Sequence, residues 1–167
     1  YIQSNFDGFG SGIVIPGTGI SLQNRASGFS LESGHPNAVG PGKRPFHTII
    51  PAFVTRDGRP EMSFGVMGGG MQPQGHAQML IRVFDYEMNV QAAIDAPRWR
   101  VLDNAKVLLE NGFDESVRDA LRQKGHDILP YDATQSFSLG GAQLIQKTQD
   151  GYIGGSESRK DGLVAAY

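Results

Sequence analysis

The sequence predicts an α+β fold, in which helices cover a sheet, for its 167 residues. Two observations carry this prediction. Short segments of strand-like composition recur along the chain and are separated by Gly, Pro and Asp turn signals. Three segments of helical character lie among them without regular alternation with the strands. Because no internal repeat or low-complexity segment interrupts the pattern, we expect one domain over residues 1–167.

The first 45 residues predict three short strands and a long irregular segment. Residues 1–4, 9–15 and 20–22 have strand composition, and Pro16-Gly17-Thr18-Gly19 is a turn between the last two. Residues 23–45 are rich in Gly, Ser, Pro and Asn. Irregular segments of this length inside a compact domain are usually functional or mobile.

A hairpin is expected next. Residues 49–55 and 62–67 have strand composition and flank Asp57-Gly58, which is a strong two-residue hairpin signal. Three glycines at 68–70 end the second strand. Further strands are expected at 99–102, 107–110, 143–147 and 152–154.

Three helices complete the predicted elements. The first begins near Pro73, the second covers 90–95 after an Asn89 cap, and the third begins after Asp114 and ends before Gly125. The apolar stripe of the first helix, at spacing i, i+3, i+4 and i+7, consists of Ala77, Leu80, Ile81 and Phe84.

The composition narrows the classes of function. Acidic and basic side chains nearly balance, at a formal net charge of −2, which gives no support to nucleic acid or an anionic membrane as partner. No apolar run approaches the roughly 20 residues that span a bilayer. Cysteine is absent and the four histidines are scattered, so we expect no metal site and no cofactor. The compartment stays open between cytoplasm and periplasm.

Five segments together carry a family resemblance. In order along the chain, they are Phe9-Gly10-Ser11-Gly12, Gly40-Pro41-Gly42-Lys43-Arg44-Pro45, Gly68-Gly69, Ala133-Thr134-Gln135-Ser136, and Ser158-Arg159 with Asp161-Gly162 and Ala166-Tyr167. Their order and spacing resemble the small subunit of gamma-glutamyltranspeptidases, which are N-terminal-nucleophile hydrolases. The resemblance implies half of a four-layer αββα sandwich, which is shared with the large subunit of the same precursor.

The resemblance also implies an enzyme made as an inactive precursor, or zymogen, that cleaves itself. The new N-terminal threonine of the small subunit then attacks the amide of a small molecule or peptide, and an acyl-enzyme passes its acyl group to water or to an amine. We expect that threonine to precede Tyr1, so residues 1–167 alone should be inactive. Hydrolase, acylase and transferase activity all remain open.

Three residues match the catalytic machinery of the family. Gly68 and Gly69 match the glycine pair whose backbone N–H groups form the oxyanion hole, and two successive donors after a strand can point at one oxyanion. Ser4 matches a hydroxyl residue that hydrogen-bonds the nucleophile. The alternatives are a tight turn for the glycines and an ordinary polar surface position for the serine.

The acyl-binding positions depart from the glutathione-cleaving members. There the Arg25 position carries an amide and the Gly28 position an aspartate, and both hold the glutamyl α-amine. Arg25 would repel an ammonium group and Gly28 cannot pair with one. We therefore expect an acyl group with a carboxylate and no α-amine, such as a glutaryl or poly-γ-glutamyl group. The predicted substrate-binding residues are Arg25, Arg44, His47 and Thr48.

Other interpretations stay open at this point. Phe6 also departs from the family, which has asparagine there, and His47-Thr48 replaces a serine pair. Arg25 and Arg44 also fit a structural role as donors to loop carbonyls, and His47 fits a partly buried structural histidine. The whole chain also fits a non-catalytic family member that kept the fold as a binding or structural module.

Overall fold

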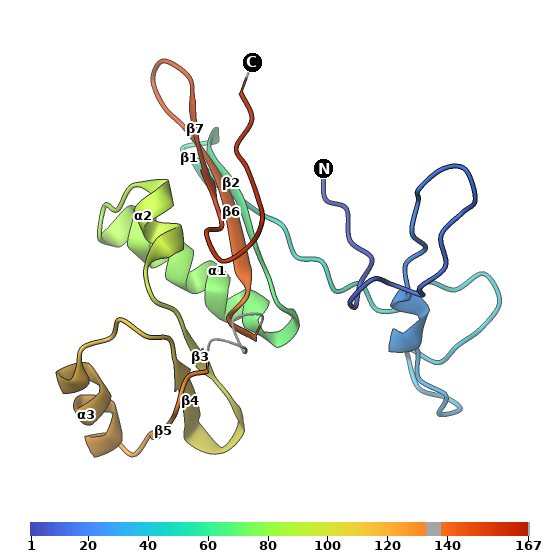
Figure 1. The fold of residues 1–167 in the computed structure, drawn as a ribbon, viewed down its shortest axis with the longest axis horizontal. Coiled ribbons are helices and arrows are strands. Elements are labelled where there is room, and N and C mark those ends of the chain that lie inside the picture. The colour runs from blue at the N-terminus through green and yellow to red at the C-terminus, as the bar shows by residue number, and fades with distance from the viewer. Residues whose placement is uncertain (133–137, 167) are drawn as a thin grey trace. The chain divides into compact units, whose positions relative to one another are not determined.

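The computed structural model describes residues 1–132 and 138–166. The chain divides into two compact units, Tyr1–Thr48 and Ile49–Tyr167. Each unit is built differently, as Figure 1 shows by its ribbon. Loops make up most of the first unit, whereas the second contains all the strands and the three α-helices.

The first unit contains a short hairpin where the sequence predicts one. Val14 and Ser21 form an isolated antiparallel bridge. The N–H of Ile15 donates to the carbonyl oxygen of Ile20 at 2.9 Å, across the predicted turn. Farther along, Arg25–Gly28 forms one turn of 3-10 helix within the segment that was expected to be irregular.

The strand predicted at 1–4 does not form, and the one predicted at 9–15 is confirmed only at its end, where residues 13–15 pair with 20–22. Gly8, Gly10 and Gly12 have φ angles of 52°, 72° and 76°, which lie in the left-handed region. A strand needs φ near −120° to −140° at every residue, so the glycines at 10 and 12 prevent a regular strand from beginning at Phe9. The backbone of these glycines therefore limits the hairpin to the residues that follow them.

A four-stranded antiparallel sheet organises the second unit. Its spatial order is β1-β2-β6-β7. The hairpin β1–β2 is confirmed, with Asp57 at φ 51° and Gly58 at φ 75°, as a two-residue turn with two left-handed positions requires. The strands are β1 (Ala52–Arg56), β2 (Arg59–Met67), β6 (Gly141–Lys147) and β7 (Tyr152–Ser156).

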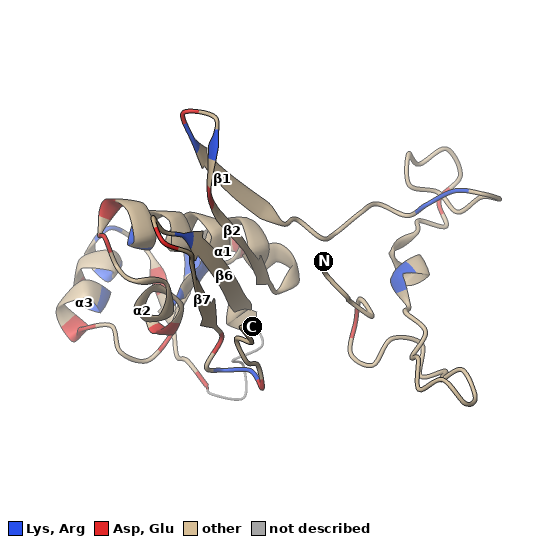
Figure 2. Cartoon of the chain, turned by 90° about the horizontal axis from the view of Figure 1, so that it is seen from above, with Lys and Arg blue, Asp and Glu red and all other residues tan. Residues whose placement is uncertain are grey.

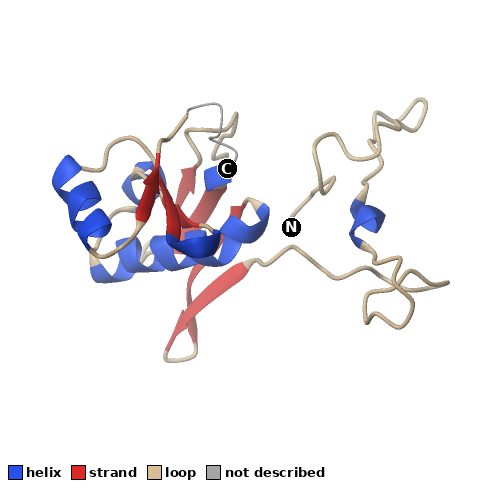
Figure 3. Cartoon of the chain, turned by 90° about the horizontal axis from the view of Figure 1, so that it is seen from below, coloured by secondary structure: helices blue, strands red, loops and turns tan. Residues whose placement is uncertain are grey.

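Helices cover one face of this sheet (Figure 3). They are α1 (Gln72–Leu80), which continues into a π-helical turn (Ile81–Asp85), and α2 (Val90–Asp95). Asn89 caps α2 as predicted, because its side-chain oxygen accepts from the N–H of Ala92 at 2.9 Å. Between the two layers lies the apolar core, formed by Met62, Phe64, Val66, Met79, Val83, Val90, Ala93, Ile94, Ala142 and Leu144.

The first helix forms where expected, but it buries a different face. Leu80 and Ile81, from the predicted apolar stripe, are exposed. Arg82 is buried instead, since its guanidinium donates to the carbonyl oxygens of Ala93 at 3.0 Å and Ala96 at 3.2 Å. Periodicity located the helix, whereas the side chains that enter the core are Met79 and Val83.

A second, three-stranded sheet has the order β3-β4-β5. β3 (Trp99–Val101) and β4 (Lys106–Leu109) were predicted, but β5 (Asp127–Leu129) was not. β5 pairs in parallel with β4 after α3 (Glu115–Gln123) returns the chain. Charged residues are frequent along α3 and at the tip of the β1–β2 hairpin (Figure 2).

The face of the four-stranded sheet opposite the helices is open around Phe53 and Ile145. At the β7 end the chain that follows β7 lies against it, since a Cβ on Gly154 would be 2.6 Å from the side chain of Val164. Phe53, Met67 and Ile145 point away from the core and are 63%, 41% and 55% exposed. The α+β class is confirmed by this arrangement of two sheets and a helical layer. Within the described residues, no helix is both long and apolar enough to span a membrane.

Candidate active site

The first unit contains a cavity of about 330 Å³. Four of the positions singled out from the sequence line it, namely Phe6, Arg25, Gly28 and Thr48. Sequence reasoning missed the other lining residues because they carry no motif. The complete lining is Phe6, Arg25, Gly28, His35, Pro36, Asn37, Phe46 and Thr48.

Arg25 is the cationic group of this cavity. Its guanidinium donates to the hydroxyl oxygen of Thr48 and, at 3.4 Å, to that of Ser4. Within the described part of the chain, no carboxylate lies at ion-pair distance from it. A guanidinium has five N–H donors, so donors remain for an anionic ligand.

Phe6 covers one face of that guanidinium. The Cζ atom of Arg25 lies 4.9 Å from the ring centroid of Phe6, within cation–π range. The backbone of Phe6 has φ 78°, and its N–H donates to the hydroxyl oxygen of Ser4 at 3.0 Å. A bulky residue at positive φ costs of order 1–3 kcal/mol, and such strain is concentrated at functional sites. Ser4 thus contacts both Arg25 and the strained residue.

Asn37 is a lining residue that hydrogen-bonds other parts of the cavity wall. Its side-chain NH₂ donates to the carbonyl oxygen of Gly28 at 2.7 Å, and its side-chain oxygen accepts from the N–H of Phe46 at 2.8 Å. Its own N–H donates to Nδ1 of His35 at 2.9 Å. The amide side chain of Asn37 therefore links the loop at Gly28 to the loop at Phe46.

Two predicted substrate-binding residues lie outside this lining. Arg44 and His47 are exposed and do not border the cavity. Arg44 lies in the segment between Asn37 and Phe46, and His47 directly precedes Thr48, the last residue of the first unit. The structure thus brings together Arg25, Thr48 and Ser4 from the predicted set.

The glycine pair lies in the second unit, where β2 ends and α1 approaches. Gly68 has φ 127° and Gly69 has φ 59°, so the chain reverses sharply through both. The carbonyl oxygen of Gly68 accepts from the N–H of Met71 at 3.1 Å. Their own N–H groups donate to none of the residues that the structure describes. Two such donors in succession can serve an oxyanion.

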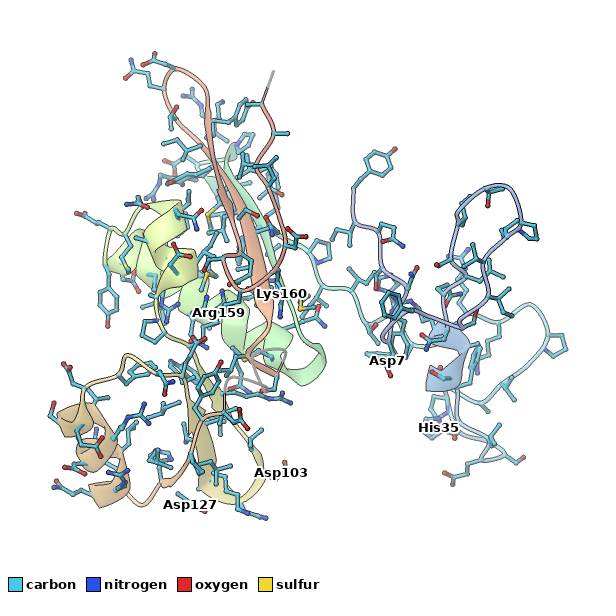
Figure 4. All side chains as sticks on the ribbon, in the orientation of Figure 1. Asp7, His35, Asp103, Asp127, Arg159 and Lys160 are labelled. Atoms are coloured by element: carbon cyan, nitrogen blue, oxygen red, sulfur yellow. The ribbon has the colours of Figure 1, made fainter. Side chains whose placement is uncertain are left out.

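A buried ion-pair network lies behind this turn. Arg98 and Glu157 have fully buried side chains and form a direct ion pair. Glu157 also accepts from Arg159, which in turn pairs with Glu110. Figure 4 labels Arg159 in the segment that follows β7.

The electrostatics of the network favour its ionised form. Burial alone would raise the pKa of Glu157, but hydrogen bonds from Arg159, from the N–H of Ala142 and from Arg98 outweigh it and lower that pKa. Burial opposes the charge of Arg159 as well, yet its hydrogen bonds with Glu110 and Glu157 raise its pKa. Both shifts favour the charged forms of Glu157 and Arg159 at neutral pH.

Comparison with known proteins identifies the family. The gamma-glutamyltranspeptidase profile matches residues 1–167. The chain belongs to the gamma-glutamyltranspeptidase family.

Relatives within the gamma-glutamyltranspeptidase family are named as hydrolase and amidohydrolase proenzymes. The chain is 36% identical to the glutathione hydrolase-like YwrD proenzyme of Bacillus subtilis, over 98% of its own length and 32% of that protein. It is 38% identical to the oxamate amidohydrolase proenzyme of Klebsiella pneumoniae, over 100% of its length and 33% of that protein. The chain thus spans about a third of these relatives.

Solved structures of gamma-glutamyltranspeptidase relatives share the fold. The crystal structure of the cephalosporin acylase of Bacillus halodurans matches with a TM-score of 0.85 and 48% identity, over 99% of this chain and 31% of that one. A gamma-glutamyltranspeptidase of Pseudomonas nitroreducens matches with a TM-score of 0.79 and 25% identity, over 100% of this chain and 91% of that one.

Two of the sequence predictions concern the motif at 133–136 and the absence of a metal site. The motif at 133–136 and Tyr167, which contributed to the family resemblance, lie outside the described residues. Among residues 1–132 and 138–166, no group of three or more His, Asp or Glu side chains converges as a metal site would require.

Proposed function

We propose that this chain is the small-subunit part of an amide hydrolase or acylase of the gamma-glutamyltranspeptidase family. The observation that carries the proposal is the cavity around Arg25, in a chain whose relatives are amide-cleaving proenzymes. In this proposal the Gly68 and Gly69 N–H groups stabilise the oxyanion, and the cavity binds the acyl group. The nucleophile is an N-terminal threonine, and its acyl-enzyme is resolved by water.

The cavity supports an acyl group that carries a carboxylate but no α-amine. Arg25 offers positive charge, and no described carboxylate neutralises it. An ammonium group would have neither an acidic partner nor, at Gly28, any side chain to contact. The named substrate of the Klebsiella relative, oxamate, is likewise an amide with a carboxylate and without an α-amine. Substrates of the glutaryl or poly-γ-glutamyl type fit this chemistry.

The large subunit of the same precursor is the proposed partner. The open sheet face around Phe53 and Ile145, and the exposed Leu80 and Ile81 on the helical layer, are apolar surfaces of the kind that interfaces bury. The chain also covers 91% of a separate chain in the Pseudomonas structure but only 31% of the acylase chain. These proportions support the role of a separate small subunit. In a four-layer sandwich, the second sheet would lie on the open face around Phe53 and Ile145.

The test uses the full-length protein that contains residues 1–167. Hydrolysis of glutaryl p-nitroanilide should exceed hydrolysis of γ-glutamyl p-nitroanilide in kcat/KM. Arg25→Gln should lower kcat/KM for the glutaryl substrate by about 10–100-fold, because a charge-assisted hydrogen bond contributes about 1.5–3 kcal/mol. The exposed Arg44→Gln is the matched control and should change it less than about threefold.

A reciprocal change sharpens the test. A Cβ at Gly28 would meet nothing within 4 Å, so Gly28→Asp fits the cavity. Combined with Arg25→Asn, it installs an amide and a carboxylate, and γ-glutamyl p-nitroanilide should then become the better substrate. If the wild-type protein never splits into two chains and hydrolyses neither anilide, the non-catalytic alternative is correct and the enzymatic proposal is withdrawn.

A further inference from the structure

Two glycine turns from distant parts of the second unit lie back to back. One is the Gly68–Gly69 turn after β2, and the other is Gly140, which precedes β6. A Cβ on Gly68 would lie 2.9 Å from the Cα of Gly140, and a Cβ on Gly140 would lie 2.3 Å from the carbonyl oxygen of Met67. Neither position has room for a side chain. The backbone around Gly140 therefore fixes the place of the Gly68–Gly69 turn.

Arg100, in β3, contacts both turns. Its Nη1 donates to the carbonyl oxygen of Ser138 at 2.9 Å. Its Nη2 lies 3.5 Å from the point where a Cβ of Gly70 would be, so the guanidinium lies beside that glycine and a side chain there would touch it. One side chain thus bridges the segment before β6 and the turn after β2.

Arg98 secures the same segment from the buried side. Its Nη1 donates to the carbonyl oxygens of Leu139 at 3.3 Å and Gly140 at 3.2 Å. Its ion-pair partner Glu157 accepts from the N–H of Ala142 at 2.7 Å. Together with the bond from Arg100 to Ser138, three consecutive carbonyls are held by two arginines that are two residues apart in the sequence.

These hydrogen bonds from Arg98 and Arg100 matter for catalysis only if the N–H groups of Gly68 and Gly69 must keep a precise direction. Oxyanion donors act because they are already aimed at the developing charge, about 2.7–3.1 Å from it, before the reaction begins. A misplacement of about 1 Å can cost about 100-fold in rate. The turn has no side chain of its own at Gly68 or Gly69 with which to hold itself.

We propose that Arg100 is a positioning residue for the oxyanion donors. By holding the segment at Ser138 against Gly70, it fixes the orientation of the Gly68 and Gly69 N–H groups. This inference rests on the proposed function, because it presumes that these N–H groups act on an oxyanion. Arg98 shares the role, but its removal would take away one of the two arginines that pair with the buried Glu157 and would endanger folding.

The test is Arg100→Gln in the full-length protein, with glutaryl p-nitroanilide as substrate. We expect kcat to fall about 10–100-fold with KM within about twofold, since the loss concerns the transition state. Arg100→Lys should recover part of kcat, because an ammonium group keeps a donor for Ser138. The matched control is Arg118→Gln, a partly buried arginine that also donates to one backbone carbonyl, that of Glu110, at 3.0 Å.

A second measurement does not depend on activity. Hydrogen exchange of a peptide covering residues 66–72 should accelerate in Arg100→Gln and stay unchanged in Arg118→Gln. Unchanged exchange, or an equal fall of kcat in both variants, would overturn the positioning role. If wild-type protein hydrolyses no anilide, the proposed function fails instead, and the exchange result alone decides whether Arg100 holds the turn.

Discussion

Glu157→Gln is the substitution for which the structure gives the clearest expected cost. The carboxylate is fully buried. One oxygen accepts from Arg98 and from the N–H of Ala142 at 2.7 Å, and the other accepts from Arg159 at 2.8 Å. An amide in its place removes the negative charge and presents an NH₂ group to at least one of these donors. Breaking a buried pair in this way costs about 3–5 kcal/mol.

The same substitution has a predictable pH dependence. The pKa of Glu157 is lower in the folded state than in the unfolded chain. Its contribution to stability is therefore complete above the unfolded value of about 4.3. It is lost as the pH falls through the lower folded value. The difference in Tm between wild type and Glu157→Gln should be constant from pH 7 to about pH 5 and narrow below that.

Scanning calorimetry of the full-length protein measures both effects, at one scan rate because unfolding of large proteins is often irreversible. Glu61→Gln is the control, since Glu61 pairs with Arg56 at the exposed tip of the β1–β2 hairpin. Its shift in Tm should be far smaller. A Glu157→Gln shift no larger than that of the control would refute the reasoning that the network stabilises the fold.

Two further predictions concern single hydrogen-bonded side chains. Asn37→Ala removes both hydrogen bonds that the amide makes within the cavity wall, so KM for glutaryl p-nitroanilide should rise several-fold, with little effect on the exchange of residues 66–72. Asn89→Ala removes the cap of α2 and should destabilise the protein by about 1 kcal/mol without changing kcat, as denaturant unfolding and steady-state kinetics would reveal. A normal KM in the first variant, or a normal stability in the second, would contradict these assignments.

The local backbone conformation could be predicted from the sequence wherever one or two residues determine it. Asp57-Gly58 required a hairpin turn, Asn89 began a helix, and Gly125, at φ 92°, ended one. Each of these signals depends on a conformation that few other residues adopt. The family resemblance, carried by motifs spread over the chain, was likewise confirmed.

Features that depend on contacts with residues distant in the sequence could not be predicted. The buried face of the first helix was predicted wrongly: Met79 and Val83 enter the core, and the charged Arg82 beside them is buried by carbonyls from beyond the helix. β5 was missed because three residues without a turn signal carry little pattern, and its pairing with β4 comes from tertiary structure. The roles of Asn37 and Arg100 likewise come from contacts with residues distant in sequence.

The candidate site was predicted in part. Arg25 and Thr48 were selected by comparison with the family, and the structure brings them into one cavity. The substrate-binding roles of Arg25 and Thr48 stay predictions, as do the roles of Ser4, Gly68 and Gly69.

The strand order has a consequence for how the second unit folds during synthesis. β2 lies between β1 and β6, and the register pairs Met62 with Gln146. After the β1–β2 hairpin and α1 leave the ribosome, one edge of β2 still lacks its partner until the segment at 141–147 follows. Unpaired edges of apolar strands promote misassembly between chains. We therefore expect nascent chains stalled between α1 and β6 to depend on chaperones more than the completed chain does.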